Sequence, residues 1–170
     1  MNDIFTTAPT AAGYTLADYR LQRMVLSPLH WQQFAWPHQT AWHAVPFNST
    51  SLEKVPANQR GVYSFVVKPG IAAHTDCAYL LYVGMVKDQF FRDRYRQYLQ
   101  ERNAGDQSRR VHVTQMLLKW DGFLWFCYAA IDDKNAIVLA EDALLAAYLP
   151  PCNRRFPATV ENDIKKLFAH

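Results

Sequence analysis

One acidic residue, Glu141, interrupts an otherwise apolar helical pattern near the C-terminal end of the chain. Ile137, Leu144 and Leu145 recur at helical spacing, and Glu141 falls on the same stripe. A carboxylate that faces an apolar interior is costly unless it is paired or binds a metal ion. Glu141 is therefore a candidate functional group, whereas Asp142, one position further round, is predicted to face solvent.

Arginines supply a second candidate group, in the segment 90–102, which is predicted to be a helix. At about 100° per residue the aromatic residues of this segment share one face. Arg94 lies at one edge of that face, Arg92 lies a little further round the other edge, and Arg96 points away. An arginine is always charged and offers a planar fork of donors to phosphate oxygens. The helical wheel favours Arg94 as the arginine near the sheet.

Two tyrosines, Tyr63 and Tyr82, lie in short apolar segments that are predicted to be strands. Taken alone, each is more typical of a core aromatic residue than of a functional one. A free tyrosine has a pKa of about 10, so a role as general base needs a lowered pKa or a relay through metal-bound water.

Three strands and three helices must position these groups, in the order strand, strand, helix, helix, strand, helix. The predicted strands are residues 62–67, 78–83 and 123–131. The predicted helices are residues 90–102, 111–120, and a last helix that opens at residues 132–135 and is closed by Pro150 and Pro151. A short helix at residues 15–24, with Thr15 as its cap, is a further candidate. The first two strands are joined by a modest loop, which favours an antiparallel pair.

Residues 1–60 differ in composition from the rest of the chain and are predicted to be an N-terminal extension. They hold three of the five tryptophans, Trp31, Trp36 and Trp42, and the segment 40–60 is turn-rich and predicted to be a connector. Packing of these rings onto the main domain is the favoured interpretation, since buried aromatics are the commoner use. A substrate-recognition surface is the alternative.

Composition sets the broad class of the protein. A chain of 170 residues is long enough for one well-filled core, and a net charge of +3 permits a nucleic-acid partner without arguing for one. Three cysteines without a CxxC pair argue against a disulfide framework or a zinc site. No signal-peptide pattern is visible, and the longest apolar run is far too short to span a bilayer. We expect a cytoplasmic protein without a membrane partner.

Taken in order, these segments resemble the GIY-YIG nuclease superfamily. The family pattern has Gly-Ile-Tyr on one strand and Tyr-Ile-Gly on the next, and this chain has GVY at residues 61–63 and YVG at residues 82–84. The family then places an arginine in the following helix, and FRDRYRQY at residues 91–98 fits with Arg94 in that slot. Each motif alone is weak, but their joint occurrence in order is much stronger.

The family pattern closes with a glutamate, an apolar helix, a proline and an asparagine, which Glu141, Pro150 and Asn153 match. The resemblance covers residues 61 to about 157, so the expected domains are the extension 1–60, a nuclease domain 61–157, and a tail or short helix 158–170. The segment between Gly84 and the arginine is about two residues longer than in compact members. Direct counting from Gly84 would therefore select Arg92, which is the reserve for Arg94.

The resemblance implies an α+β fold, an α/β sandwich with a small three-stranded, mainly antiparallel sheet flanked by helices. It also implies roles for individual residues. Glu141 would hold a divalent cation, Mg²⁺ with Mn²⁺ as an alternative, and Arg94 would stabilise charge on the phosphate. Tyr63 and Tyr82 would engage the water or the scissile phosphate, with Tyr63 favoured near the water. The remaining roles are site-fixing hydrogen bonds from Asn153 and close backbone approach at Gly61 and Gly84.

Further basic residues lie close in sequence to the proposed site residues and are candidates for contacts with backbone phosphates. They are Arg96, Arg109, Arg110, Arg154 and Arg155. An ordinary mixed surface is the alternative interpretation, because the overall charge is modest.

The expected function is a free-standing, metal-dependent endonuclease that hydrolyses DNA phosphodiester bonds, for example in restriction or defence. A homodimer would suit cleavage of both strands, since each chain offers one site, and a targeting partner protein is the other arrangement considered. The rival hypotheses are a catalytically silent nucleic-acid-binding or assembly module on the same fold, and an RNA-directed nuclease.

Overall fold

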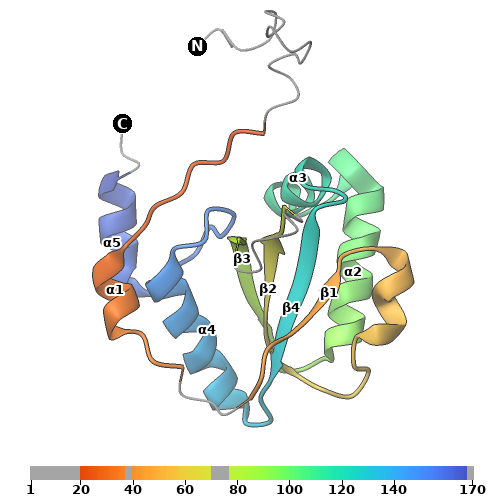
Figure 1. Ribbon diagram of the computed structural model, residues 1–170, viewed down its shortest axis with the longest axis horizontal. Helices are drawn as coiled ribbons and strands as arrows, with labels where there is room; N and C mark the ends of the chain where they lie inside the picture. Colours follow the sequence, from red (N-terminus) through yellow and green to blue (C-terminus); the bar gives the residue numbers. More distant parts are fainter. Residues whose placement is uncertain (1–19, 37–39, 70–76, 168–170) are drawn as a thin grey trace, which may run out of the picture.

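The computed structural model describes residues 20–36, 40–69 and 77–167, and this part of the chain forms an α+β domain around one open antiparallel sheet (Figure 1). The strand order is β1-β4-β2-β3, and every neighbouring pair is antiparallel. The strands are β1 (His43–Pro46), β2 (Gly61–Val67), β3 (Tyr79–Val86) and β4 (Leu124–Ala130).

Helices cover both faces of the sheet (Figure 1). They are α1 (Pro28–Gln33), α2 (Phe91–Ala104), α3 (Val111–Lys119), α4 (Lys134–Tyr148) and α5 (Ala158–Leu167), with short 3-10 turns η2 (Ser49–Lys54) and η3 (Gly105–Gln107). Helix α4 packs on one face, with α1 against it, and α2 and α3 lie on the other. The helices predicted at residues 90–102, at residues 111–120 and after residues 132–135 are confirmed, as are the three predicted strands, and the segment 158–170 contains a helix. The short helix considered at residues 15–24 is wrong over residues 20–24, which are not helical, and its residues 15–19 lie outside the described part of the chain.

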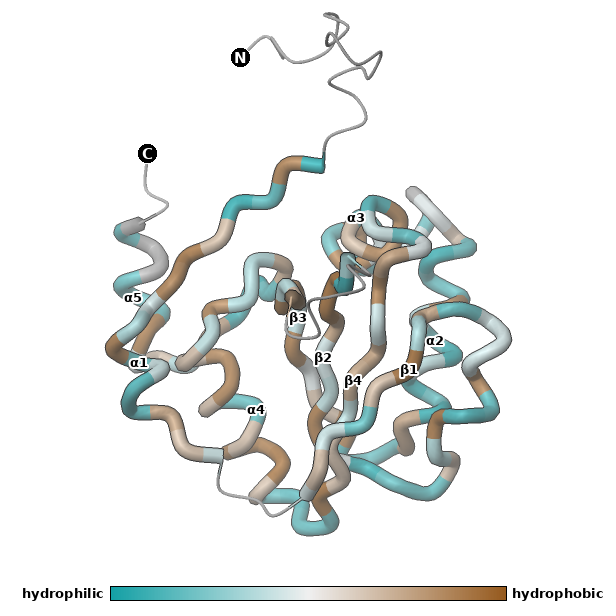
Figure 2. Tube along the Cα trace, viewed as in Figure 1, coloured by the Kyte–Doolittle hydropathy of each residue, from teal (hydrophilic) through white to brown (hydrophobic). Residues whose placement is uncertain are grey.

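The two faces of the sheet have different cores. The α2 face is aromatic and includes Tyr63, Phe65 and Phe126, all with 0% exposure. The α4 face is aliphatic, with Val62 from β2 packed in a cluster that includes Ile137 from α4. Because both faces are covered, the strands are nearly continuous in hydrophobic residues, as Figure 2 shows. The buried tyrosines, Tyr63, Tyr95, Tyr98 and Tyr128, all belong to the cluster on the α2 side of the sheet.

The prediction of a three-stranded sheet was wrong, because a fourth strand comes from the segment that was expected to be a connector. Strand β1 pairs with β4 from His43 opposite Tyr128 to Pro46 opposite Trp125. Four residues ending in a proline give little periodic signal, and proline is tolerated because β1 is an edge strand. The N-terminal extension thus contributes from residue 43 to the main sheet, while its residues 1–19 lie outside the described part of the chain.

The caps at the two ends of α4 fix where the helix begins and where the chain leaves it. Asp133 caps the first turn by accepting a hydrogen bond from the backbone N–H of Ala136 at 2.6 Å. At the other end Leu149 adopts a left-handed conformation, with φ of 45°, and its N–H donates to the carbonyl of Leu145. Pro150 and Pro151 then prevent continuation of the helix. The chain turns back across the edge of the sheet.

Gly84 gives room to the most deeply buried tyrosine. Tyr63 and Gly84 are directly opposite each other in the β2–β3 pair. A Cβ atom on residue 84 would lie 2.4 Å from the Tyr63 hydroxyl oxygen and 2.6 Å from Cζ. The tyrosine ring therefore lies over the glycine and carries its hydroxyl toward the outer edge of β3.

We expect Gly84→Ala to destabilise the protein by about 3 kcal/mol, because the Tyr63 ring is fully buried and has no free space to enter. Urea denaturation measures the change in the free energy of unfolding. Gly122→Ala is the control: its Cβ would meet no atom within 4 Å, so only the cost of its positive φ, on the order of 1 kcal/mol, applies. Equal losses in the two variants would contradict this account.

Candidate active site

The candidate site lies at the outer edge of β3, where the two faces of the sheet meet. Phe65 pairs with Tyr82 and Val66 pairs with Leu80, so Leu81 forms a bulge in β3. The carbonyl of Leu81 accepts a hydrogen bond from the N–H of Cys152 at 2.9 Å. The bulge thus fastens the loop after α4 to the edge strand.

Asn153 makes the second attachment of this loop. Its Oδ1 accepts from the backbone N–H of Val83 at 2.9 Å, and its Nδ2 donates to the carbonyl of Val83 at 2.8 Å. The side-chain amide therefore pairs with the exposed edge as a neighbouring strand would. This geometry is in keeping with the site-fixing role expected of Asn153.

A cavity of about 630 Å³ opens beside this attachment and joins residues from both sides of the sheet. Tyr82 comes from β3 and Glu141 comes from α4, and Asn153 lies between these elements. The other polar or charged residues around it are Arg110, His112, Asp142, Arg154 and Arg155. Residues separated by more than 70 positions are thus brought to one concave, polar surface.

Arg94 does not line this cavity, and a buried hydroxyl network holds its guanidinium. Arg94 Nε donates to the Tyr63 hydroxyl at 3.1 Å, and the Tyr63 and Tyr98 hydroxyls are 2.7 Å apart. The Arg94 guanidinium also lies 5.3 Å from the centroid of the Tyr98 ring, and its Nη1 donates to Gln97 at 2.9 Å. These contacts orient the guanidinium at the N-terminal half of α2.

Tyr63 and Tyr82 have different environments, although their rings lie only 6.4 Å apart. Tyr63 is fully buried, and burial together with the neighbouring Tyr82 raises the pKa of Tyr63 to about 12, against the smaller opposite effect of Arg94. A raised pKa is the reverse of what a general base requires. The raised pKa argues against Tyr63 as a general base, and Tyr82, not Tyr63, lines the cavity.

Glu141 carries the other charge at this edge. Burial, with a further contribution from the neighbouring Asp142, raises the pKa of Glu141 to about 7, while Arg94 and Lys87 lower it. Within the described residues Glu141 makes no hydrogen bond or ion pair. The opposing effect of Arg94 means that the guanidinium and the carboxylate share one electrostatic environment.

Arg92, the reserve for Arg94, lies on another side of α2. Its Nε donates to the carbonyl of Val55 at 2.7 Å, and its Nη1 and Nη2 bind the carboxylate and carbonyl of Glu53 at 2.9 and 3.0 Å. These contacts tie η2 to α2. The structure brings Arg94, and not Arg92, to the tyrosines.

The five predicted phosphate-binding arginines separate into paired and unpaired groups. Arg96 is exposed and bonded to Asp93 at 3.0 Å, and Arg110 donates to Glu101 at 2.9 Å while lying 4.9 Å from the Tyr98 ring centroid. Arg109 lines a neighbouring cavity of about 450 Å³ that also includes Arg94 and Arg110.

Arg154 and Arg155 are the basic residues best placed for an added anion. Both are exposed at the rim of the candidate cavity, and in the part of the chain that the structure describes they make no hydrogen bond or ion pair. They come directly after Asn153, so the bonds between Asn153 and Val83 of β3 also fix the position of their backbone. They are available to a phosphate without loss of an existing pair.

Sequence reasoning gave no functional role to Tyr98. It lies one helical turn after Arg94, is fully buried, and has a pKa raised by burial and by Tyr63 and Tyr82. The sequence signal for this role is the spacing: Tyr98 follows Arg94 by four positions, so the two side chains are neighbours on the helix. Tyr98 supports the Tyr63–Arg94 pair from the interior.

The donor set fits a hard cation that keeps most of its water. No group of three or more His, Cys, Asp or Glu side chains arranged for metal binding occurs among the described residues. Magnesium is commonly bound through one or two carboxylates, with the remaining positions filled by water and substrate phosphate. Glu141 in a polar cavity with open space meets that requirement.

Comparison with known protein families, with curated proteins and with solved structures gave no match. Across the described ranges no helix combines the length and hydrophobicity needed to cross a membrane. The resemblance to GIY-YIG nucleases therefore stays a prediction from the sequence motifs.

We expect Glu141→Gln to stabilise the protein at pH 8 by up to about 3 kcal/mol when a chelator is present. The pKa of Glu141 is raised from its ordinary 4.5 to about 7 on folding, so its favourable contribution is complete below pH 4.5 and is lost as the pH rises through 7. Urea denaturation between pH 4.5 and pH 8 should show the two proteins converging at low pH. A constant difference would contradict this, and Asp132→Asn, which removes an exposed carboxylate that does not line the cavity, is the control.

For Asn153→Asp we expect a loss of about 2 kcal/mol at pH 7, with partial recovery as the pH falls below 4. The carboxylate keeps the bond from the Val83 N–H but sets a second oxygen against the Val83 carbonyl. Protonation restores a donor. Asn153→Ala should lose a similar amount without the recovery, as measured by urea denaturation at both pH values. Identical pH profiles for the two variants would show that the donated bond is unimportant.

Proposed function

We propose that this protein is a metal-dependent endonuclease of the GIY-YIG type that hydrolyses phosphodiester bonds in DNA. The observation that carries the proposal is the convergence of Glu141 and Tyr82 in one cavity, with Arg94 close enough to lower the pKa of Glu141. The motif order in the sequence supports the same function. Two arginines without ion pairs in the described chain, at the rim of that cavity, favour an anionic polymer as substrate.

The location of each residue determines its proposed role in phosphodiester cleavage. Arg94 is held by neutral hydroxyl and amide acceptors, so its full charge is available to a phosphate oxygen. Tyr82 lines the cavity, and its hydroxyl would donate a hydrogen bond to the phosphate or to the attacking water. Tyr63 and Tyr98 act as positioning residues, since they bind Arg94 or its partner in the interior.

Glu141 would hold the Mg²⁺ or Mn²⁺ ion through its carboxylate oxygens. When bound, such an ion supplies Lewis-acid stabilisation of the phosphate and a lowered pKa for water. Because Glu141 must be ionised to bind a cation, occupancy should rise as the pH increases through about 7. Arg154 and Arg155 would contact phosphates that flank the cleaved bond, which gives affinity that weakens with added salt.

The decisive experiment is cleavage of plasmid DNA with Mg²⁺, with Mn²⁺ and with a chelator. We expect cleavage only with metal, at a rate that rises between pH 6 and pH 8. Glu141→Gln should abolish it, and Arg94→Ala should reduce the rate by about 100-fold or more. Arg92→Ala and Arg96→Ala are the matched controls, because they remove arginines that face away from the cavity, and both should retain the activity per folded molecule.

Four outcomes would overturn parts of the proposal. Full activity in both Glu141→Gln and Arg94→Ala would refute the site. Loss of activity in Arg92→Ala alone would reverse the choice of arginine. Salt-sensitive binding of DNA without cleavage in either metal would favour the catalytically silent module, and cleavage of single-stranded RNA alone would favour an RNA-directed nuclease.

A further inference from the structure

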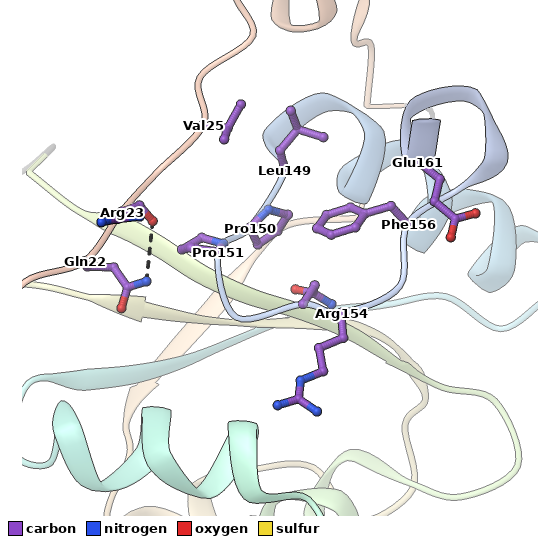
Figure 3. A pocket seen from close by; sticks show the side chains of 10 residues that line it. Gln22, Arg23, Val25, Leu149, Pro150, Pro151, Arg154, Phe156 and Glu161 are labelled. Atoms are coloured by element: carbon purple, nitrogen blue, oxygen red, sulfur yellow. Dashed lines mark hydrogen bonds between the residues drawn. The ribbon is translucent and has the colours of Figure 1, made fainter. Parts of the chain in front are cut away.

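A second cavity, of about 370 Å³, adjoins the candidate site and is closed by a segment from the start of the described chain. On one side lie residues 149–151 and Phe156, from the chain between α4 and α5 (Figure 3). On the other side runs an extended segment, residues 20–26, which we call the strap. Gln22, Arg23 and Val25 of the strap complete the wall.

The first residues of the strap are held by contacts with the C-terminal end of α3, so the strap forms a defined wall. Lys119 Nζ donates to the carbonyl of Leu21 and to Gln22 Oε1. The guanidinium of Arg20 lies 5.3 Å from the centroid of the Phe123 ring. At its other end the strap passes into α1, which packs against α4.

The lining of this cavity suits a flat ring that carries polar edges. Pro150, Pro151 and Phe156 offer apolar surfaces, and Figure 3 shows the Phe156 ring beside Pro150. Gln22 lies at the same opening and supplies an amide with both donors and acceptors. Apolar walls with a few polar groups are typical of small-molecule pockets of about 300 to 1,000 Å³.

The charged groups around the cavity favour a ligand attached to phosphate. Arg23 and Arg154 are exposed, and neither forms an ion pair within the described ranges. Glu161 also lines the cavity, so the charged side chains around it are two arginines and one glutamate. Figure 3 shows the Arg154 side chain extending away from the prolines.

The two cavities are neighbours. Asn153, Arg154 and Phe156 line both the 370 Å³ cavity and the 630 Å³ candidate site. A strand whose phosphate lies beside Glu141 would therefore place an adjacent nucleoside at the prolines and Phe156. A base in such a position is outside a duplex stack.

We infer that the cavity under the strap binds one unpaired base of a DNA strand, next to the phosphate held at the candidate site. This inference rests on the proposed function for the position of the phosphate. It defines the substrate class as DNA with an unpaired nucleotide, such as a flap or a bulge, in preference to a continuous duplex. It also gives the N-terminal strap a role in substrate selection.

The test compares two fluorescent DNAs, a duplex and the same duplex with one unpaired 2-aminopurine nucleotide, with a chelator present so that nothing is cleaved. The full-length protein should bind the unpaired form about tenfold more tightly, with a change in 2-aminopurine fluorescence on binding. Val25→Phe fills the cavity from the strap and should remove both the preference and the fluorescence change. Leu26→Phe is the matched control, because residue 26 is 63% exposed and does not line the cavity.

A second pair of variants covers the case in which Val25→Phe does not fold. Arg23→Ala should reduce the preference for the unpaired form, whereas Lys54→Ala, which removes an exposed cation on η2, should not. Equal binding of the two DNAs by the wild-type protein, or equal losses in Val25→Phe and Leu26→Phe, would overturn the inference even if metal-dependent cleavage is observed. A preference that depends on Val25, without cleavage in Mg²⁺ or Mn²⁺, would support the base site and refute the nuclease proposal.

Discussion

The hydrogen-bonding requirement of an edge strand determines where the candidate site forms. Strand β3 has a partner on one side only, so the backbone groups of its outer side must bond elsewhere. Cys152 and Asn153 satisfy the groups of Leu81 and Val83. The chain after α4 is therefore held against β3, and Arg154, next in sequence, takes its place at both cavities.

The same edge brings together opposite charges that do not neutralise each other. Arg94 approaches from α2 and is bonded to Tyr63 and Gln97, both neutral acceptors. Glu141 approaches from α4, and burial still outweighs Arg94 in setting its pKa. An ion pair within the protein would leave neither group available to a ligand. In the proposed function, a cation bound to a phosphate would complement both groups.

Much of this arrangement could be predicted from the sequence, because it depends on regular elements. The helix of Glu141 and the strands of Tyr63 and Tyr82 have clear periodicity, and the turn at Pro150 marks the end of α4. Strand β1 was missed because four residues carry too little pattern. The difference in burial between Tyr63 and Tyr82 was also missed, since the depth of a side chain depends on its partner across the sheet, which for Tyr63 is Gly84. The strap was missed because an extended segment of mixed residues has no period, and its residues 20–24 were considered as the end of a short helix.

The choice between Arg92 and Arg94 shows which kind of sequence argument is more reliable. Counting from Gly84 selects Arg92, but that count crosses the connection between β3 and α2, and loops tolerate insertions. The helical wheel uses only positions within α2, whose geometry is set by backbone hydrogen bonds. It selects Arg94, the arginine that contacts Tyr63. Positions compared within one helix do not depend on the length of the preceding loop. The helical wheel should therefore take precedence over the count from Gly84 when the two disagree.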